Sequence, residues 1–416
     1  MEKEKFKNIA YEEIRPRLGS SCMPQDLPYF TEEENRFRME VRDFATEELL
    51  PYVNEIEEKD DEQLSAQLAR RTAKRGYSNQ MIPREWGGGG RNCVAEIIVT
   101  EELPATSFVA GALAFASCTF LALPIYKSGT EEMKRNIMVP LLAGEKLGGM
   151  AMTEPAAGSD VASTETTAVR DGDDWVLDGE KRFIGNGSTA DYLLTFAVTN
   201  PEAKRATDRL TAFVIDTNQP GFEVVKDCNL MGFRGGRWSW LRYNNLRVSH
   251  ANILGELNRG WYVAMEELDA ERAGAGAIFV GVMRSAYELA AKYSIERRQF
   301  GRTIGDFQAI SFRLADMYAQ IEASRLLAWK CARQVDLARP ATKESSAVKV
   351  HNSEACIKVV ESAFQIIGGN AYTKEYPIDR YMRDSRVFTV FAGTNEIQRV
   401  IMSREILKEA KNWPIG

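Results

Sequence analysis

A glycine-containing segment in the first half of the chain carries two hydroxyl side chains, Thr153 and Ser159, within Met152-Thr-Glu-Pro-Ala-Ala-Gly-Ser-Asp160. A turn of this kind lets backbone N–H groups approach a phosphate or ring oxygen closely. The same residues would serve equally well as a loop that leads into a strand. Taken alone, the segment leaves both interpretations open.

A pair of arginines, Arg297 and Arg298, could hold a phosphate group. The guanidinium fork donates two parallel hydrogen bonds to phosphate oxygens. Paired arginines on a helix more often face solvent. We expect a ligand role for Arg297 and a surface position for Arg298.

Four acidic residues lie between positions 266 and 271. A carboxylate in a dry pocket has a raised pKa and can act as a general base. A helical glutamate is usually solvated, however. Glu267 and Glu271 lie one turn apart on the same helical face, so spacing does not choose between them.

Composition excludes several other kinds of chemistry. Only two histidines are present, and the six cysteines are scattered without a C-x-x-C pair, which disfavours a zinc site, a disulfide framework and a Ser-His-Asp triad. The net charge of −6 gives no case for nucleic acid as a partner.

Gly and Pro interrupt the uncharged stretch 108–126, which predicts a buried helix rather than a membrane span. The first residues lack a signal or transit pattern, so we expect a cytoplasmic protein, although a processed organellar protein would look the same.

The elements that would position these residues fall into blocks, because 416 residues are too many for one hydrophobic core. A polar extension covers residues 1–30. Residues 31–147 are predicted to be helical, beginning with a capping box at Thr31–Glu34. Residues 259–416 are again long helical segments. Between them, residues 148–258 predict an antiparallel sheet from short β-branched or aromatic runs at 166–170, 175–177, 192–198, 210–215 and 222–225.

Six segments in a fixed order resemble those of the acyl-CoA dehydrogenases, over residues 31–410. They are Met152–Asp160, Arg297–Arg302, Phe307–Ile310, Gln365–Gly369, Tyr381–Asp384 and Gly393–Arg399. The resemblance implies an α+β multidomain fold with a helical N-terminal domain, an antiparallel β middle domain and a C-terminal four-helix bundle. It also implies FAD, an acyl-CoA substrate, electron-transfer flavoprotein as the electron acceptor, and usually a homotetramer.

The resemblance assigns cofactor contacts residue by residue. Some belong to the flavin ring, some to the diphosphate and ribityl chain, and two come from a neighbouring subunit. The flavin contacts are Met152, Thr153, Ser159, Phe183 and Gly185; the diphosphate and ribityl contacts are Arg297, Gln299, Phe300, Thr394 and Glu396; the contacts from the neighbouring subunit are Gln365 and Gly369; Met150 and Gln308 are further cofactor contacts.

Two stretches depart from the family's pattern. Phe183-Ile-Gly-Asn-Gly187 stands where relatives usually have Trp-Ile-Thr-Asn-Gly. Phe183 can still stack on a flavin, but Gly185 has only a backbone N–H to offer near the reactive nitrogen. The polar stretch 231–240 is also atypical, and the sequence gives no physical account of it.

The catalytic base is the third departure. In most family members a Glu directly before Gly-Thr takes the Cα proton, while the flavin takes a hydride from Cβ. This chain has Ala392 there, which leaves a backbone N–H to polarise the thioester carbonyl. Isovaleryl- and long-chain acyl-CoA dehydrogenases carry the Glu in a helical Leu-x-x-Glu-Arg string, found here at 268–272. We therefore predict that Glu271 is the base. The implied substrate contacts are Ser159, Asp269, Arg272, Ala392 and Gly393.

The acyl group and the direction of reaction are less constrained. A helical Glu is compatible with branched, cyclic or medium to long acyl groups, and the absence of Lys and Arg from residues 101–125 disfavours a dicarboxylyl-CoA. The same flavin and base could serve an acyl-CoA oxidase or an enoyl-CoA reductase, although the length favours a dehydrogenase over the larger oxidases. A non-catalytic scaffold is a further alternative, and the intact Arg297 and Gly393 argue against it.

Overall fold

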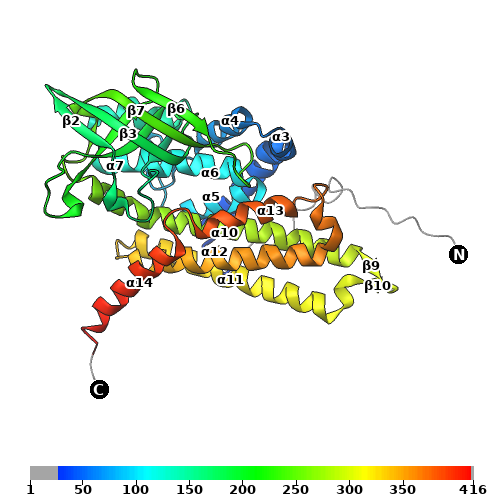
Figure 1. The fold of residues 1–416 in the computed structure, drawn as a ribbon. Coiled ribbons are helices and arrows are strands. Elements are labelled where there is room, and N and C mark those ends of the chain that lie inside the picture. The colour runs from blue at the N-terminus through cyan, green and yellow to red at the C-terminus, as the bar shows by residue number, and fades with distance from the viewer. Residues whose placement is uncertain (1–26, 414–416) are drawn as a thin grey trace.

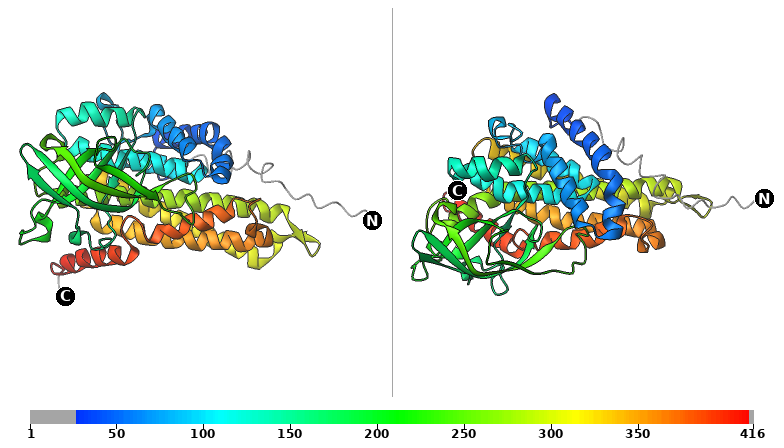
Figure 2. Two further views of the ribbon diagram at one scale, coloured as in Figure 1. Left: turned by 45° about the horizontal axis from the view of Figure 1, so that its top comes forward. Right: turned by 90° about the horizontal axis from the view of Figure 1, so that it is seen from above.

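The structure is a computed structural model that describes residues 27–413, with the side chains of 266–270 outside the description. A β-sheet lies at one end of the molecule, and long helices run side by side along its length (Figure 1). A further group of helices, coloured blue to cyan, lies beside the sheet and along the long helices (Figure 2). The order of helical, β and helical blocks confirms the predicted fold class.

The N-terminal helices begin where the sequence predicts. Thr31 Oγ1 accepts a hydrogen bond from the Glu34 N–H at 3.2 Å, and the Glu34 carboxylate accepts one from the Thr31 N–H at 2.8 Å, which confirms the capping box. The continuous helical run 108–128 is long and apolar enough to cross a membrane, but 83% of its most apolar window is buried inside the molecule, as predicted for a core segment. The helices are α2 (Glu32–Phe44), α3 (Val53–Lys59), α4 (Glu62–Thr72), α5 (Cys93–Thr106), α6 (Phe108–Ser117), α7 (Leu123–Ser128), α8 (Glu131–Met133) and α9 (Val139–Leu142).

The middle block forms one sheet in the order β6-β7-β3-β2-β4-β5-β8, with β1 beside β4. Most pairs are antiparallel as predicted, but β1 and β2 each pair with β4 in parallel. The five predicted runs lie in β2 to β6, whereas β1, β7 and β8 were not predicted. The strands are β1 (Gly148–Ala151), β2 (Thr167–Asp171), β3 (Asp174–Gly185), β4 (Tyr192–Val198), β5 (Leu210–Asp216), β6 (Phe222–Asp227), β7 (Trp238–Ser249) and β8 (Ile253–Leu254).

The C-terminal block packs around α10, which is buried along most of its length. It lies close against α5 at Gly281, where a Cβ would lie 2.3 Å from the Glu101 carbonyl oxygen, so only glycine fits there. The elements are α10 (Gly260–Glu296), β9 (Arg298–Gln299), β10 (Arg302–Thr303), α11 (Gln308–Asp336), α12 (Thr342–Ile367), α13 (Ile378–Ser385) and α14 (Asn395–Ala410).

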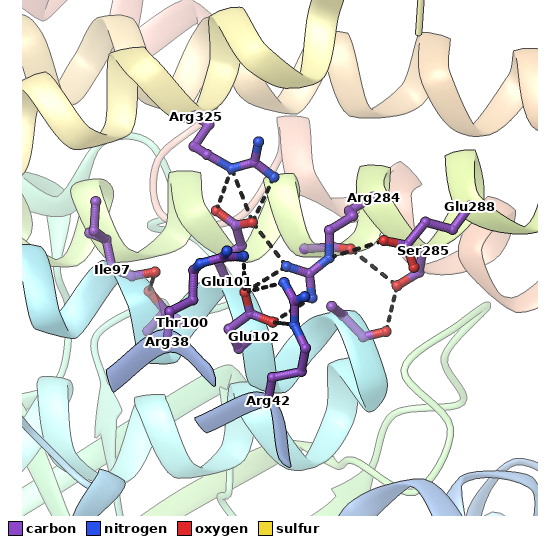
Figure 3. Close-up of polar contacts among 12 residues, drawn as sticks. Arg38, Arg42, Ile97, Thr100, Glu101, Glu102, Arg284, Ser285, Glu288 and Arg325 are labelled. Carbon is purple, nitrogen blue, oxygen red and sulfur yellow. Dashed lines mark hydrogen bonds and ion pairs between the residues drawn. The ribbon is translucent and has the colours of Figure 1, made fainter. Parts of the chain in front are cut away.

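Buried charges fix α10 against α5 and α2 (Figure 3). The Glu102 carboxylate accepts hydrogen bonds from Arg42 at 3.0 Å and from Arg284 at 2.7 Å. Glu101 accepts from Arg284 at 3.1 Å and from Arg325, on α11, at 2.8 Å. Since each of these side chains is buried, the network sets the register of α10, the helix that carries Glu271.

Candidate functional site

Glu271 lies on α10 with only 1% of its surface exposed. Burial raises the pKa of Glu271 to about 7, although the positive charges of Arg272 and Lys349 act to lower it. Its Oε2 atom accepts no hydrogen bond from the described part of the chain. A buried carboxylate with a pKa near neutrality has the properties of a general base.

A buried lysine on α12 accompanies Glu271. The Lys349 ammonium donates a hydrogen bond to Asn395 Oδ1 at 2.8 Å, and both side chains are buried. Burial lowers the pKa of Lys349 to about 8, while Glu271 and Glu396 act to raise it. Lys349 therefore links the surroundings of Glu271 to the first residue of α14. Lys349 was not predicted from the sequence, although a single Lys within the small and apolar run 345–350 was a usable signal.

The loop before α14 has a constrained backbone. Ala392 and Gly393 have φ angles of 57° and 81°, in the left-handed region. Gln398 Nε2 donates to their carbonyl oxygens at 3.1 and 3.5 Å, and a Cβ on Gly393 would lie 2.6 Å from that nitrogen. Within residues 27–413, neither backbone N–H is bonded to an acceptor. These two N–H groups are therefore available to polarise a carbonyl oxygen.

Two contacts connect this loop to α10. Lys349 bonds to Asn395 and interacts electrostatically with Glu271. The ring of Phe391 packs edge-to-face against Phe279 of α10, with centroids 5.9 Å apart. The structure thus brings the predicted base and the predicted carbonyl-polarising loop to one region of the molecule.

The predicted flavin contacts on the sheet cluster at the ends of β1 and β3. Arg182 N donates to the Thr153 carbonyl at 2.8 Å, and Lys181 Nζ donates to the Met152 carbonyl at 3.3 Å, so the β3 backbone and side chains hold the turn after β1. Phe183 has a φ of 61° and is 48% exposed, which presents its ring at the surface. Gly185 ends β3, and Ser159 is exposed. Met150 lies on β1 and is half-buried.

A second set of predicted contacts lies far from Glu271. Arg297 directly follows α10, and the helix spans roughly 39 Å from residue 271 to residue 297 at about 1.5 Å per residue. Figure 1 places β9 and β10 at the end of the molecule opposite the sheet. The Asn370 amide donates to the Tyr293 hydroxyl at 3.0 Å, which holds the segment after α12 at this same end. This distal set comprises Arg297, Gln299, Phe300, Gln308, Gln365 and Gly369.

The remaining predicted residues belong to α10 and to the start of α14. Arg272 is buried beside Glu271, whereas the side chain of Asp269 lies outside the described residues. Thr394 caps α14, with its Oγ1 accepting from the Ile397 N–H at 3.4 Å. Glu396 is exposed in the first turn of that helix.

Three family models match nearly the whole chain. They are described as the N-terminal, middle and C-terminal domains of acyl-CoA dehydrogenase. They match residues 31–145, 149–246 and 258–407, respectively.

Curated relatives include both dehydrogenases and reductases. An acyl-CoA dehydrogenase of Bacillus subtilis is 38% identical, covering 91% of this chain and 99% of its own length. A 3-(aryl)acrylate reductase of Clostridium sporogenes is 35% identical, covering 91% and 100%. Subunit CarC of the caffeyl-CoA reductase-Etf complex of Acetobacterium woodii is 36% identical, covering 92% and 100%.

Solved structures show the same architecture. Butyryl-CoA dehydrogenase from Megasphaera elsdenii superposes with a TM-score of 0.87 at 33% identity, covering 92% of this chain and 100% of that one. PigA with FAD and proline superposes with a TM-score of 0.88 at 25% identity, also covering 92% and 100%.

Proposed function

The chain belongs to the acyl-CoA dehydrogenase family, and we propose that it oxidises an acyl-CoA thioester between Cα and Cβ with Glu271 as the base. The family assignment makes it an oxidoreductase of acyl-CoA thioesters with FAD as cofactor. The observation that carries the proposal is the burial of Glu271, with a pKa raised to about 7, in the region where the loop at Ala392 leaves two backbone N–H groups unbonded.

The residues present fit a flavin nucleotide. Phe183 offers an exposed ring for stacking, and the position of a Cβ at Gly185 is nearly empty, which leaves room beside the strand. The N-terminus of α14, capped by Thr394, is suited to a negatively charged group. The chemistry that FAD supplies when bound is the transfer of a hydride to or from Cβ.

The protein's own groups would perform the proton transfer. The Glu271 carboxylate takes the Cα proton, and the N–H groups of Ala392 and Gly393 stabilise the negative charge that develops on the thioester oxygen. Burial keeps water from Glu271 and strengthens both effects. The positive charge of Lys349 favours the ionised form of Glu271. Its ammonium donates its hydrogen bond to Asn395 and not to Glu271, so the carboxylate stays available as a proton acceptor.

Replacing Glu271 by Gln tests the base assignment. Glu271→Gln removes the proton acceptor but keeps the side-chain volume, so we expect the yellow holoprotein to bind acyl-CoA and to lose anaerobic flavin bleaching by several orders of magnitude. Glu267→Gln is the control one turn earlier, and Glu288→Gln is a control on the same helix for a second buried carboxylate whose pKa burial raises to about 7. Normal bleaching in Glu271→Gln would refute the assignment.

The reverse reaction, reduction of an enoyl-CoA, is a second candidate. It is favoured by two relatives that are named as reductases of an arylacrylate and of caffeyl-CoA. With a pKa near 7, Glu271 is partly protonated at neutral pH and can also deliver a proton to Cα. Reoxidation of the chemically reduced holoprotein by enoyl-CoA, compared with bleaching by the saturated partner, decides which direction is faster.

We infer that the acyl group is compact, branched or cyclic, rather than long. One turn after Glu271, a Cβ at Gly274 would lie 2.6 Å from the ring of Phe115, so α6 closes tightly over α10 there. Phe391 adds a second ring next to the loop at Ala392. A bleaching screen of straight, branched, cyclic and dicarboxylic acyl-CoAs tests this inference, and Phe115→Ala should extend the range to longer chains.

Electron-transfer flavoprotein and a second copy of this chain are the proposed partners. The name of CarC's complex with Etf supports the first. The second is supported by the distance of the distal set from the proposed base, since Arg297 lies roughly 39 Å along α10 from Glu271, more than one extended FAD molecule spans. We therefore propose that the distal set completes the cofactor site of a neighbouring copy within a homotetramer.

A further inference from the structure

Trp238 stands opposite the glycine at the end of β3. It is the first residue of β7, and the register of the two strands pairs Gly185 with Trp238 directly. Among the described residues other than its two chain neighbours, the heavy atom that a Cβ at Gly185 would approach is the indole Nε1, at 4.0 Å. The indole therefore borders the space that a side chain at position 185 would fill.

The indole N–H of Trp238 is without a hydrogen-bond acceptor among residues 27–413. The two other tryptophans of the sheet are bonded: Trp240 Nε1 donates to Glu180 Oε2 at 2.9 Å, and Trp175 Nε1 donates to His250 Nδ1 at 3.2 Å. This N–H is not among the buried unpartnered groups of the described residues, so it is accessible from outside the protein. The donor at Trp238 is therefore open to a ligand that lies beside Gly185.

The ring of Trp238 is held firmly by its neighbours. Phe233 and Phe183 contact it with centroid distances of 6.2 and 6.4 Å. Its backbone carbonyl accepts from the Cys228 N–H at 2.8 Å. The ring also packs against the hydrophobic core of the C-terminal helices, the cluster that includes Phe391. A planar heteroaromatic group next to Phe183 would meet a rigid aromatic surface with one unbonded N–H donor.

We propose that Trp238 binds the flavin ring of FAD by donating its indole N–H beside Gly185, in place of a side-chain hydroxyl at that position. The inference rests on FAD as the cofactor, and it depends neither on Glu271 nor on the direction of the reaction. A donor stabilises the reduced ring, which carries more negative charge, more than the oxidised ring. Trp238 therefore raises the reduction potential of the bound flavin.

The test replaces Trp238 by Phe, which keeps an aromatic ring but removes the N–H. Loss of one hydrogen bond to a charged group changes the ratio of reduced to oxidised flavin by about tenfold, which lowers the two-electron potential by about 30 mV. The potential of the holoprotein is measured by equilibration with a reference dye, and the visible spectrum of the bound flavin should shift as well. Trp240→Phe, on the same strand face, is the matched control and should leave both unchanged.

A rescue separates hydrogen bonding from packing. In the Trp238→Phe background, Gly185→Ser supplies a hydroxyl and should restore the potential, whereas Gly185→Ala adds only a methyl group and should not. An unchanged potential in Trp238→Phe, or equal effects of Ser and Ala, would overturn the proposal. If Trp238→Phe retains no FAD, Trp238→His, which keeps a ring N–H, must retain FAD and a near-normal potential for the proposal to stand. The loss of bleaching in Glu271→Gln is independent of all these outcomes.

Discussion

At the scale of single residues, we expect the ionisation of Glu271, the proposed base, to set the pH range of the reaction. Only the carboxylate form can accept the Cα proton, and burial raises the pKa of Glu271 to about 7. We expect the rate of anaerobic bleaching to rise about tenfold per pH unit below pH 7 and to level off above it, while enoyl-CoA reduction follows the opposite trend. Stopped-flow bleaching between pH 5.5 and 9 measures the midpoint.

Lys349 should control that midpoint. Its positive charge favours the ionised form of Glu271, as Arg272 does, while Glu396 and Glu354 act on Lys349 itself. Lys349→Met should therefore move the midpoint upward by about one pH unit. Lys349→Arg keeps the charge and should keep the midpoint near 7. A profile that is the same for Met and Arg would show that Lys349 acts only through packing and its bond to Asn395.

Individual site residues were harder to predict from the sequence than the helices and strands that carry them. The Leu-x-x-Glu-Arg string selected Glu271, and the structure adds that its side chain is buried; its catalytic role stays a prediction. Lys349 and Trp238 were missed for a physical reason. A lysine and a tryptophan are ordinary surface or core residues until their neighbours are known, and the neighbours here, Asn395 and Gly185, are distant in sequence.

At the scale of elements, the network around Glu102 holds α2, α5 and α10 together. Burial alone would raise the pKa of Glu102, but Arg284 and Arg42 together hold it well below its usual range. Glu102→Gln leaves these buried guanidinium groups without a full counter-charge, so we expect the free energy of unfolding at pH 7 to fall by about 3 kcal/mol. Chemical denaturation measures the loss.

The control for this network is an exposed ion pair. Glu55 bonds to Lys59 at 2.6 Å at the surface of α3, and Glu55→Gln should change the stability by less than about 1 kcal/mol. The effect of Glu102 also has a pH signature. Because its pKa is lower in the folded than in the unfolded protein, its contribution is present above about pH 4.5 and is lost in stronger acid. A loss in Glu102→Gln that stayed constant below pH 4 would argue against the electrostatic explanation.

The elements themselves were largely predictable, because their signals are local. The capping box begins α2, and the β-branched runs that follow turns lie in β2, β4, β5 and β6. Strand β7 was missed because its apolar and polar pattern is inverted: Ser239 is buried, while Trp238 and Trp240 lie on the half-exposed face. A pattern that expects tryptophan to be buried and serine to be exposed therefore assigns the wrong face to this strand. The pairing of β7 with β3 shows which face each residue occupies.

At the scale of the whole molecule, the distal end is the strongest indication of assembly. Phe300 and Tyr372 are 93% and 90% exposed. Phe300 lies between β9 and β10, and Tyr372 closely follows Asn370, which is bonded to Tyr293 near the end of α10, so both lie at the end that carries the distal set of predicted cofactor contacts. Large apolar side chains that are exposed together at one place on a surface are typical of an interface. Binding of FAD and association of subunits should therefore depend on each other.

Phe300→Glu tests that dependence. In the single chain Phe300 contacts Phe307 edge-to-face, with ring centroids 6.0 Å apart, and is otherwise exposed to solvent. A charge at this position should therefore leave the fold intact and change the free energy of unfolding by less than about 0.5 kcal/mol. In the assembly it would place a carboxylate in an apolar contact beside a diphosphate. We expect light scattering to show a smaller species and the ratio of FAD to protein to fall in parallel. Val169→Glu, at a 65% exposed position on β2, is the control at the opposite end. Full FAD occupancy in a monomeric Phe300→Glu protein would show that one chain holds the cofactor alone, and the distal residues would then need another role.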